Sequence, residues 1–324
     1  MAAIVYSPRY RIDLGTHVFP TRKYPRLHDA LVARRLAAPS DFIEPEPAGW
    51  DDLELVHTPD YLGRLRDGTM GAFERARLEL DPAPAVVEGF RLMCGGTILA
   101  ARIALGLAHA PDSVERPGAD PGAHRPTRRI GLHLGGGFHH ACADHGEGFC
   151  LFHDVAVAIR VLERERAVGR VAIVDCDVHH GNGTAFIFAG DRRVFTFSIH
   201  QAHNFPAFKP PSRLDIDLPD DAGDELYLRQ LAGALPRVFA SGPDLVFYLA
   251  GADPFEGDTL GGLGLTKAGL RRRDRLVLGA ARELNVPVVV TLAGGYAQDV
   301  SDTVDIHAAT MEEAVAIFAA AGAR

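Results

Sequence analysis

The sequence predicts a single α/β domain built on a central, mostly parallel sheet with helices on both faces. Short runs rich in Val, Ile and Leu recur along the chain, and longer amphipathic segments lie between them. The length of 324 residues, with 47% hydrophobic and 23% charged side chains, suits one large globular unit. We therefore expect residues 1–324 to form one domain.

The expected elements follow one another in the α/β order. Proline, glycine and charged residues dominate the stretches 39–47 and 111–129, which we expect to be surface loops within the domain. Continuous apolar runs predict buried strands at Ile130–Leu134, Val171–Val174, Val194–Ile199, Leu245–Ala250 and Val286–Leu292. Amphipathic patterns predict helices at Val155–Glu165, Asp224–Phe239, Lys267–Leu284 and Met311–Ala320. Ligands bind beyond the carboxyl ends of parallel strands, so the residues after each run are the candidates for chemistry.

Composition narrows the function classes. The formal net charge is −8 and no dense Lys/Arg tract occurs, so we expect no nucleic-acid partner. No signal-peptide layout and no run of 18 or more apolar residues is found, so we expect no membrane insertion. The cysteines lack C-x-x-C spacing, which predicts buried free thiols in a reducing cytoplasm, and they are Cys94, Cys142, Cys150 and Cys176.

A histidine pair follows the first predicted strand, in the segment GGGFHH. The glycines let the backbone bend closely around a ligand, and His139 and His140 come directly after them. Adjacent imidazoles can hold different protonation states if each has a different partner. An accidental pair is the alternative, but the position after a strand and a glycine turn favours function.

Carboxylates and imidazoles follow the next strands. In DCDVHHGNGT, alternation along an extended chain predicts Asp175, Asp177 and His179 on one face, where a carboxylate and an imidazole can reach one ion. Asp253 in GADPFEGD follows another strand and would complete an Asp/His/Asp set with an open position for water. The alternatives are a structural hydrogen-bond cluster and, for Asp253, a turn cap. The Asp residues of GDTLGG and DIDLP are expected to form turns.

A tyrosine follows the last predicted strand, in the segment AGGY. Tyr296 comes after two glycines, which favours an exposed phenol over a packed core side chain. A phenol at a strand end could donate a hydrogen bond to a carbonyl oxygen and stabilise an oxyanion.

The motifs GGFHHA, GFC, DCDVHHGNGT, FSIH, GADPFEGD and AGGY, in this order, resemble the histone deacetylase superfamily. The resemblance runs from about Tyr6 to the last helix, and the N-terminal stretch with PDYL and DHGEGFC is most similar to bacterial class IV-type members. It implies one domain with an eight-stranded sheet. It also implies metal-dependent hydrolysis that removes an acetyl or longer acyl group from a lysine-like amine.

The resemblance also implies roles for the strand-end residues. Asp177, His179 and Asp253 would bind zinc, with iron(II) as the alternative because metal availability also selects the ion. His139 and His140 would form the catalytic pair, with His140 as the expected general base.

The remaining implied roles concern the groups around this pair. Tyr296 would polarise the acyl carbonyl. Asp175 and Asn182 would orient the two histidines, although class I members usually carry Asp at the second position. Asp175 would also help to bind K⁺ or Na⁺ together with Ser198 and the backbone at Ile199.

The implied substrate site is an apolar tunnel for an acylated lysine, an acylated polyamine or a small acylated amine. The residues that would contact the substrate are Gly148, Phe149, Phe205, Leu260 and Gly295. His153 replaces the Asn that is common after GFC. Oligomeric state is not predicted.

The strand-end residues leave two other functions open. An arginase-like ureohydrolase would need two manganese ions. A binuclear site requires two Asp ligands in this segment, but GADPFEGD offers one well-placed Asp. A non-catalytic acyl-lysine binding module would not need His139, His140 and Tyr296.

Overall fold

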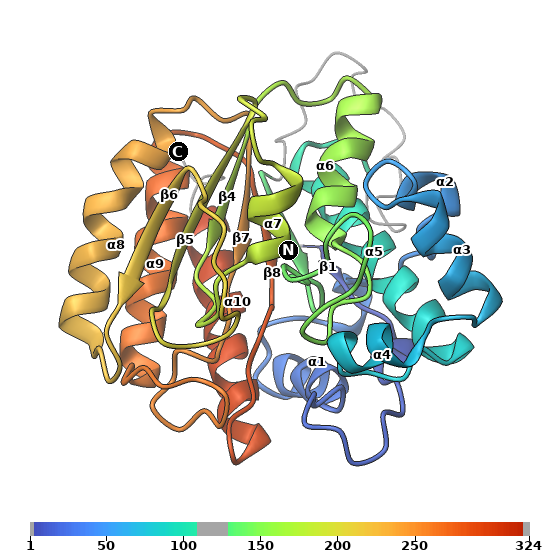
Figure 1. Cartoon of the computed structure of the whole chain (residues 1–324). Helices are drawn as coiled ribbons and strands as arrows, with labels where there is room; N and C mark the ends of the chain where they lie inside the picture. The colour runs from blue at the N-terminus through green and yellow to red at the C-terminus, as the bar shows by residue number, and fades with distance from the viewer. Residues whose placement is uncertain (1–2, 109–128, 320–324) are drawn as a thin grey trace.

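A parallel sheet of eight strands forms the centre of the part of the chain that the computed structural model describes, residues 3–108 and 129–319 (Figure 1). The strand order is β2-β1-β3-β8-β7-β4-β5-β6, and every pairing is parallel. This confirms the predicted fold class, with a sheet that is wholly parallel in the described residues.

The five strands expected from apolar runs are all present, with ends that shift by two residues at most. Their side chains are almost all buried, as runs of Val, Ile and Leu between two helical layers require. The strands are β3 (Ile130–His133), β4 (Val171–Asp175), β5 (Val194–Gln201), β7 (Leu245–Leu249) and β8 (Val288–Thr291).

Three strands outside the centre of the sheet were not expected, namely the edge strands β2 and β6 and the strand β1 next to β2. β1 (Ile4–Val5) and β2 (Phe42–Ile43) are two residues long, too short for a periodic signal. β2 and a 3₁₀ turn lie in stretch 39–47, which is therefore not wholly a loop. β6 (Leu214–Leu218) is half-exposed and contains the Asp residues of DIDLP, so the prediction that these only form turns is wrong. Of the second predicted loop, residues 111–128 lie outside the described residues.

The four expected helices are present as α6 (Asp154–Arg164), α8 (Asp224–Phe239), α9 (Lys267–Glu283) and α10 (Val300–Ala319). α10 begins well before the predicted Met311, because Asp299 Oδ1 accepts the backbone N–H of Ser301 at 2.9 Å and starts the helix there. The predicted end, Ala320, lies outside the described residues. The other helices are α1 (Lys23–Ala33), α2 (Trp50–Leu53), α3 (Pro59–Asp67), α4 (Ala72–Leu78), α5 (Pro84–Ala104) and α7 (Asn182–Ile187).

The helices form two groups, with α8, α9 and α10 on one side of the sheet and α5 and α6 on the other (Figure 1). α5 is long and apolar enough to cross a membrane by length and composition, the one such helix among the described residues. However, 72% of its apolar window is buried within the fold, as in the core helix of a globular protein.

A buried ion pair lies beneath the carboxyl ends of β4 and β7. Arg273 and Asp274 of α9 are both buried, and the guanidinium donates to Asp274 Oδ1 at 2.8 Å. The same guanidinium donates to the backbone carbonyls of Cys176 and Gly251, and Tyr248 and Thr310 donate to the carboxylate. The pair thus ties α9 to the two chain segments that follow these strands.

Removing one partner of this pair should be costly. We expect Asp274→Ala to lower the free energy of unfolding by about 3–5 kcal/mol, because it leaves a guanidinium buried without its counter-charge. Urea unfolding of the full chain measures the change. Asp305→Ala, which removes an exposed partner of Arg34 and Lys267, should cost no more than about 1 kcal/mol. If the two variants lost the same unfolding free energy, the buried pair would not stabilise the fold more than the exposed one.

Candidate active site

The functional motifs meet because the four strands that precede them are neighbours. GGGFHH follows β3, AGGY follows β8, GADP follows β7 and DCDVHH follows β4, and β3-β8-β7-β4 is the order of the central sheet. The carboxyl ends of parallel strands lie at one edge, so four segments that are distant in sequence converge there.

Asp177, His179 and Asp253 form a buried cluster at this edge. Their ligand atoms lie within 4.8 Å of one another. His179 Nδ1 is 3.0 Å from Asp177 Oδ1 and 3.4 Å from Asp253 Oδ2. Backbone N–H groups of Val178 and Gly294 hold the other carboxylate oxygens at 2.9 and 2.7 Å. Asp253 Oδ2 is buried and receives no hydrogen bond.

The electrostatics of this cluster favour a cation. Burial and the nearby Asp177 carboxylate raise the pKa of Asp253 to about 7. Burial opposes the charged form of His179, but Asp177 and Asp253 outweigh it and raise its pKa to about 10. Two buried carboxylates, one with an unsatisfied oxygen, therefore fit a divalent ion held by oxygen and nitrogen ligands.

Asp177 and His179 do reach one cluster as predicted, but the extended chain expected from Asp175 to His179 is wrong. β4 ends at Asp175, and the chain then turns twice, because Asp175 Oδ1 accepts the N–H of Asp177 at 3.1 Å and Asp177 Oδ1 accepts that of His179 at 3.0 Å. The cluster of potential ligands accordingly contains Asp177 and His179 but not Asp175.

Asp175 instead pairs with His139, the first histidine of the pair. Its Oδ2 lies 2.7 Å from His139 Nδ1, and Asn182 Oδ1 lies 2.7 Å from His140 Nδ1. The two histidine Nε2 atoms are 3.0 Å apart, a distance that allows one proton between them.

The two imidazoles differ in charge. Burial opposes protonation of His139, but the carboxylates of Asp175 and Asp177 raise its pKa to about 9. Burial and the positive charge of His139 lower the pKa of His140 well below its usual value. A carboxylate beside one ring and a neutral amide beside the other thus produce a protonated and an unprotonated histidine.

Tyr296 lies at the entrance to this cluster. Asp258 Oδ2 accepts its backbone N–H at 2.6 Å, and Thr259 Oγ1 donates to its carbonyl at 2.7 Å. Burial and the nearby carboxylates raise the pKa of Tyr296 well above 10, so the phenol keeps its proton. Asp258 does form the predicted turn, through the N–H groups of Leu260 and Gly261, and it also holds Tyr296 in place.

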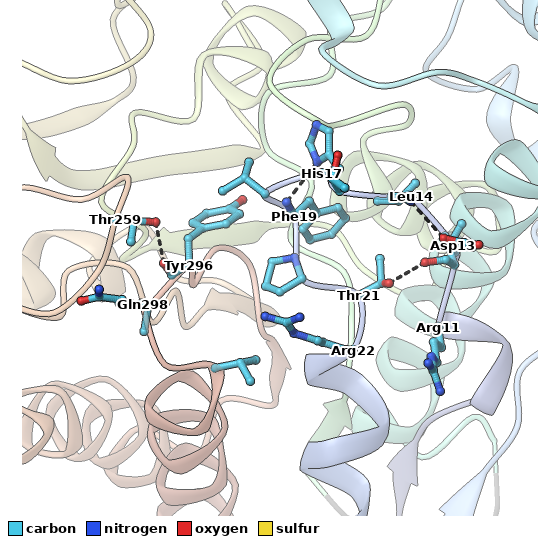
Figure 2. Close-up of a pocket in the computed structure, with 17 residues that line it drawn as sticks. Arg11, Asp13, Leu14, His17, Phe19, Thr21, Arg22, Thr259, Tyr296 and Gln298 are labelled. Carbon is cyan, nitrogen blue, oxygen red and sulfur yellow. Dashed lines mark hydrogen bonds between the residues drawn. The ribbon is translucent and has the colours of Figure 1, made fainter.

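A cavity of about 650 Å³ opens beside Tyr296. Figure 2 shows Tyr296, Thr259 and Gln298 on one side of it and residues of segment 11–22 on the other. A second, inner cavity of about 20 Å³ adjoins His139, His140 and Tyr296. Its volume suits about one water molecule.

Of the predicted substrate-contact residues, Gly148 and Phe149 line the inner cavity, whereas Phe205, Gly295 and Leu260 contact or adjoin the residues around it. Phe149 lines the cavity, and the Phe205 ring lies 4.8 Å from the His140 ring. Gly148 has φ +50°, and a Cβ there would come 2.8 Å from His140. Gly295 lies behind Tyr296, where a Cβ would come 2.8 Å from Thr303. The Leu260 carbonyl accepts a hydrogen bond from Asn204, next to Phe205.

Two residues at the site were not predicted. Phe19 stacks on Phe149, with ring centroids 6.3 Å apart, and lines both cavities. Lys23 is buried, donates to the Ala293 carbonyl at 2.9 Å and lies 5.8 Å from the centroid of the Tyr296 ring. Burial lowers the pKa of Lys23 to about 8. Neither residue follows a predicted strand, so the sequence pattern did not identify them as site residues, and the tertiary structure does.

The predicted monovalent-cation residues are neighbours in the sheet. Asp175 of β4 lies opposite Ser198 of β5, and Ile199 is the next residue along that strand. Ser198 Oγ pairs with His200 Nδ1 at 2.9 Å. Binding of K⁺ or Na⁺ here stays a prediction.

His57 and His153 support the loop that carries Gly148 and Phe149. His57 Nδ1 donates to the Cys142 carbonyl and its Nε2 accepts the N–H of His153, both at 3.0 Å. His153 caps α6 through Nδ1, which accepts the N–H of Ala156 at 3.1 Å, and its Nε2 lies 2.8 Å from Thr184 Oγ1. The histidine found after GFC thus joins α6 to α7.

The contacts of His57 require a neutral ring, which gives a pH prediction. Burial lowers its folded-state pKa to about 4, below the unfolded value of about 6.5, so its stabilisation is complete above pH 6.5 and is lost as the pH falls toward 4. His57→Gln keeps a donor and an acceptor but does not titrate. Between pH 7 and pH 5 the free energy of unfolding should fall for both proteins. We expect the fall to be about 2 kcal/mol smaller for His57→Gln than for the wild type.

Denaturant unfolding at the two pH values measures this difference. His203→Gln is the matched control, because the His203 side chain is 80% exposed, and its loss should equal that of the wild type. An identical pH dependence for His57→Gln and the wild type would be evidence against a neutral, buried His57.

Comparison with known proteins gives a consistent family match. Residues 17–311 match the model of the histone deacetylase domain. The sequence is 38% identical over 306 residues to an uncharacterised protein of Picosynechococcus sp., and the match covers 94% of this chain and 95% of that protein. It is 33% identical over 312 residues to histone deacetylase 2 of Arabidopsis thaliana, and the match covers 91% of this chain and 74% of that protein. The crystal structure of the HDA15 HD domain superposes with a TM-score of 0.70 at 22% identity over 98% of this chain and 95% of that one, which shows a shared fold.

Proposed function

The chain belongs to the histone deacetylase domain family, and from this premise we propose that it is a zinc-dependent amidohydrolase that removes an acyl group from a lysine-like amine. One observation carries the proposal. A buried Asp177/His179/Asp253 cluster with an unsatisfied carboxylate oxygen lies beside a histidine pair of which one member is neutral.

Asp177, His179 and Asp253 would hold the metal ion. Two carboxylates and one imidazole leave a coordination position open, which favours a catalytic over a structural zinc site, and iron(II) accepts the same ligands. The ion supplies Lewis acidity to a carbonyl oxygen and lowers the pKa of water.

His140 would act as the general base. Its Nδ1–H is held by Asn182 Oδ1, which leaves the lone pair on Nε2. That lone pair accepts from the protonated His139 at 3.0 Å, and water would replace His139 as the donor and give up its proton there. The water oxygen forms a bond to the acyl carbon, the C–N bond then breaks, and the proton on His140 passes to the leaving amine. His139, kept positive by Asp175, stabilises the negative charge that develops on the carbonyl oxygen.

Tyr296 would donate its hydroxyl proton to the same oxygen in a hydrogen bond. The phenol remains protonated because burial raises its pKa well above 10. Its backbone is held from both sides, by Asp258 and Thr259, so the ring is positioned at the cavity entrance before substrate arrives.

The cavities favour a short acyl group on a slender amine. The inner cavity of about 20 Å³ holds about one water molecule, so any acyl group must displace wall side chains such as Phe19 or Phe149, and a long chain must displace them further. The outer cavity of about 650 Å³ can admit a peptide or polyamine. Overpacking a site costs about 1–3 kcal/mol. We therefore expect kcat/KM to be at least about tenfold higher for acetyl-lysine than for decanoyl-lysine.

A panel of peptides with acetyl-, butyryl- and decanoyl-lysine, together with acetylated polyamines, tests this preference by release of the free amine. Phe149→Ala should narrow the difference between acetyl and decanoyl substrates if the wall limits chain length. Decanoyl turnover by the wild type equal to or above acetyl turnover would assign the enzyme to long-chain substrates instead.

The two other functions have less support. An arginase-like binuclear centre needs a further carboxylate near Asp253, but both oxygens of Asp258 already accept backbone N–H groups. A binding module would not need a base and a phenol positioned at the same cavity. Release of urea from guanidino substrates, or tight binding of acyl-lysine without release of acid, would favour the first or the second alternative.

A further inference from the structure

A second group of metal-ligating side chains lies on the loop between β3 and α6. Cys142 Sγ, a ring nitrogen of His145 and a carboxylate oxygen of Glu147 lie within 4.8 Å of one another. Cys142 is a buried free thiol, and the side chains of His145 and Glu147 are 17% and 14% exposed. None of the three belongs to the Asp177/His179/Asp253 cluster.

His145 is oriented as a metal-binding histidine is. Its Nδ1 lies 2.6 Å from Asp144 Oδ1, which fixes a proton on that nitrogen and turns Nε2 toward Cys142 and Glu147. Nε2 is buried and makes no hydrogen bond. A carboxylate that holds the far nitrogen of a ligand histidine is the usual outer partner in zinc sites.

The spacing suits a tetrahedral ion. Bonds of about 2.0–2.3 Å place two ligands of one tetrahedral zinc roughly 3.5 Å apart. His145 Nε2 and Glu147 Oε2 are already 3.4 Å apart, and Cys142 Sγ lies within 4.8 Å of the ligand atoms of both residues.

We propose that Cys142, His145 and Glu147 bind a second divalent ion of the zinc class, distinct from the ion of the proposed catalytic site. A thiolate, an imidazole and a carboxylate together select zinc over magnesium, calcium and manganese, which prefer oxygen ligands. Water would complete the tetrahedron.

The ion would brace one wall of the substrate tunnel. Its ligands span residues 142–147, and Gly148 and Phe149 follow directly. Glu147 Oε2 also accepts from the exposed Arg77 guanidinium at 3.2 Å and from the Asn182 amide at 3.3 Å. Asn182 holds His140, so the site adjoins the general base through one residue.

Metal content of the full-length protein tests the proposal. After saturation with zinc at neutral pH and removal of free metal, we expect two zinc ions per wild-type chain and one in either Cys142→Ala or Asp253→Ala. Replacement by cobalt(II) should give a thiolate-to-metal charge-transfer band in Asp253→Ala, which the catalytic oxygen and nitrogen ligands cannot produce, and none in Cys142→Ala.

A variant that keeps all three ligands provides a second test in case Cys142→Ala does not fold. Asp144→Asn leaves all three ligands in place and should weaken zinc binding at this site by about 10- to 100-fold. Asp29→Asn is the matched control, because Asp29 also pairs with a histidine, His28, but not at a metal-ligating cluster. One zinc per wild-type chain with no charge-transfer band, or equal zinc affinity for Asp144→Asn and the wild type, would overturn the proposal.

Discussion

Alanine in place of His140 should lower kcat by about 10²- to 10⁴-fold, the usual contribution of a general base. His140 is the imidazole that stays neutral near the metal ligands, because burial and the charge on His139 lower its pKa. In the described part of the chain its side-chain hydrogen-bond partners are His139 and the neutral amide of Asn182. Initial rates of amine release at saturating acetyl-lysine peptide measure the loss.

The zinc content of His140→Ala should equal that of the wild type, since His140 is not among the three clustered ligands. Added imidazole should restore part of the rate, because the substitution leaves a ring-sized space. His203→Ala, at an exposed histidine, is the control and should keep full activity. A kcat for His140→Ala within tenfold of the wild type would assign the base to another group.

Tyr296→Phe should lower kcat by about 10²- to 10³-fold, the range seen when one donor to an oxyanion is removed. The substitution deletes only the hydroxyl, so the ring contacts with Phe19 and Phe149 and the backbone bonds to Asp258 and Thr259 are kept. We therefore expect KM, thermal stability and zinc content to change little while turnover falls.

Tyr6→Phe makes the same chemical change at a tyrosine that packs against His28 and Phe42, away from the site, and should leave kcat unchanged. If Tyr296→Phe instead raised KM strongly at constant kcat, Tyr296 would contribute to substrate binding and not to stabilisation of the oxyanion.

The central strands could be predicted because burial on both faces leaves a clear trace in the sequence. β4 and β7 are continuous apolar runs, and the residues after them converge by the geometry of parallel sheets. β1 and β6 could not be predicted in the same way. β1 has two residues, and β6 alternates Asp with apolar residues at the edge of the sheet, which is also the composition of a turn.

The site residues that follow strands could be predicted from the sequence. The site residues that reach the site through tertiary packing could not. Asp177, His179 and Asp253 meet as the motifs implied, whereas Phe19 and Lys23 reach the site from the N-terminal segment and α1. The turn after Asp175 was also missed, because side-chain hydrogen bonds to the backbone, and not strand periodicity, direct the chain there.

The most direct test of the central claim, metal-dependent amide hydrolysis at the strand ends, is acetate release from an acetyl-lysine peptide by chelator-stripped and zinc-reloaded protein. We expect no acetate release from the stripped protein, recovery on zinc addition, and no release from Asp253→Ala under either condition. Asp244→Ala should match the wild type, because Asp244 accepts the backbone N–H groups of Gly169 and Arg170 and does not belong to the metal-ligand cluster. Acetate release by Asp253→Ala at the wild-type rate would contradict the account.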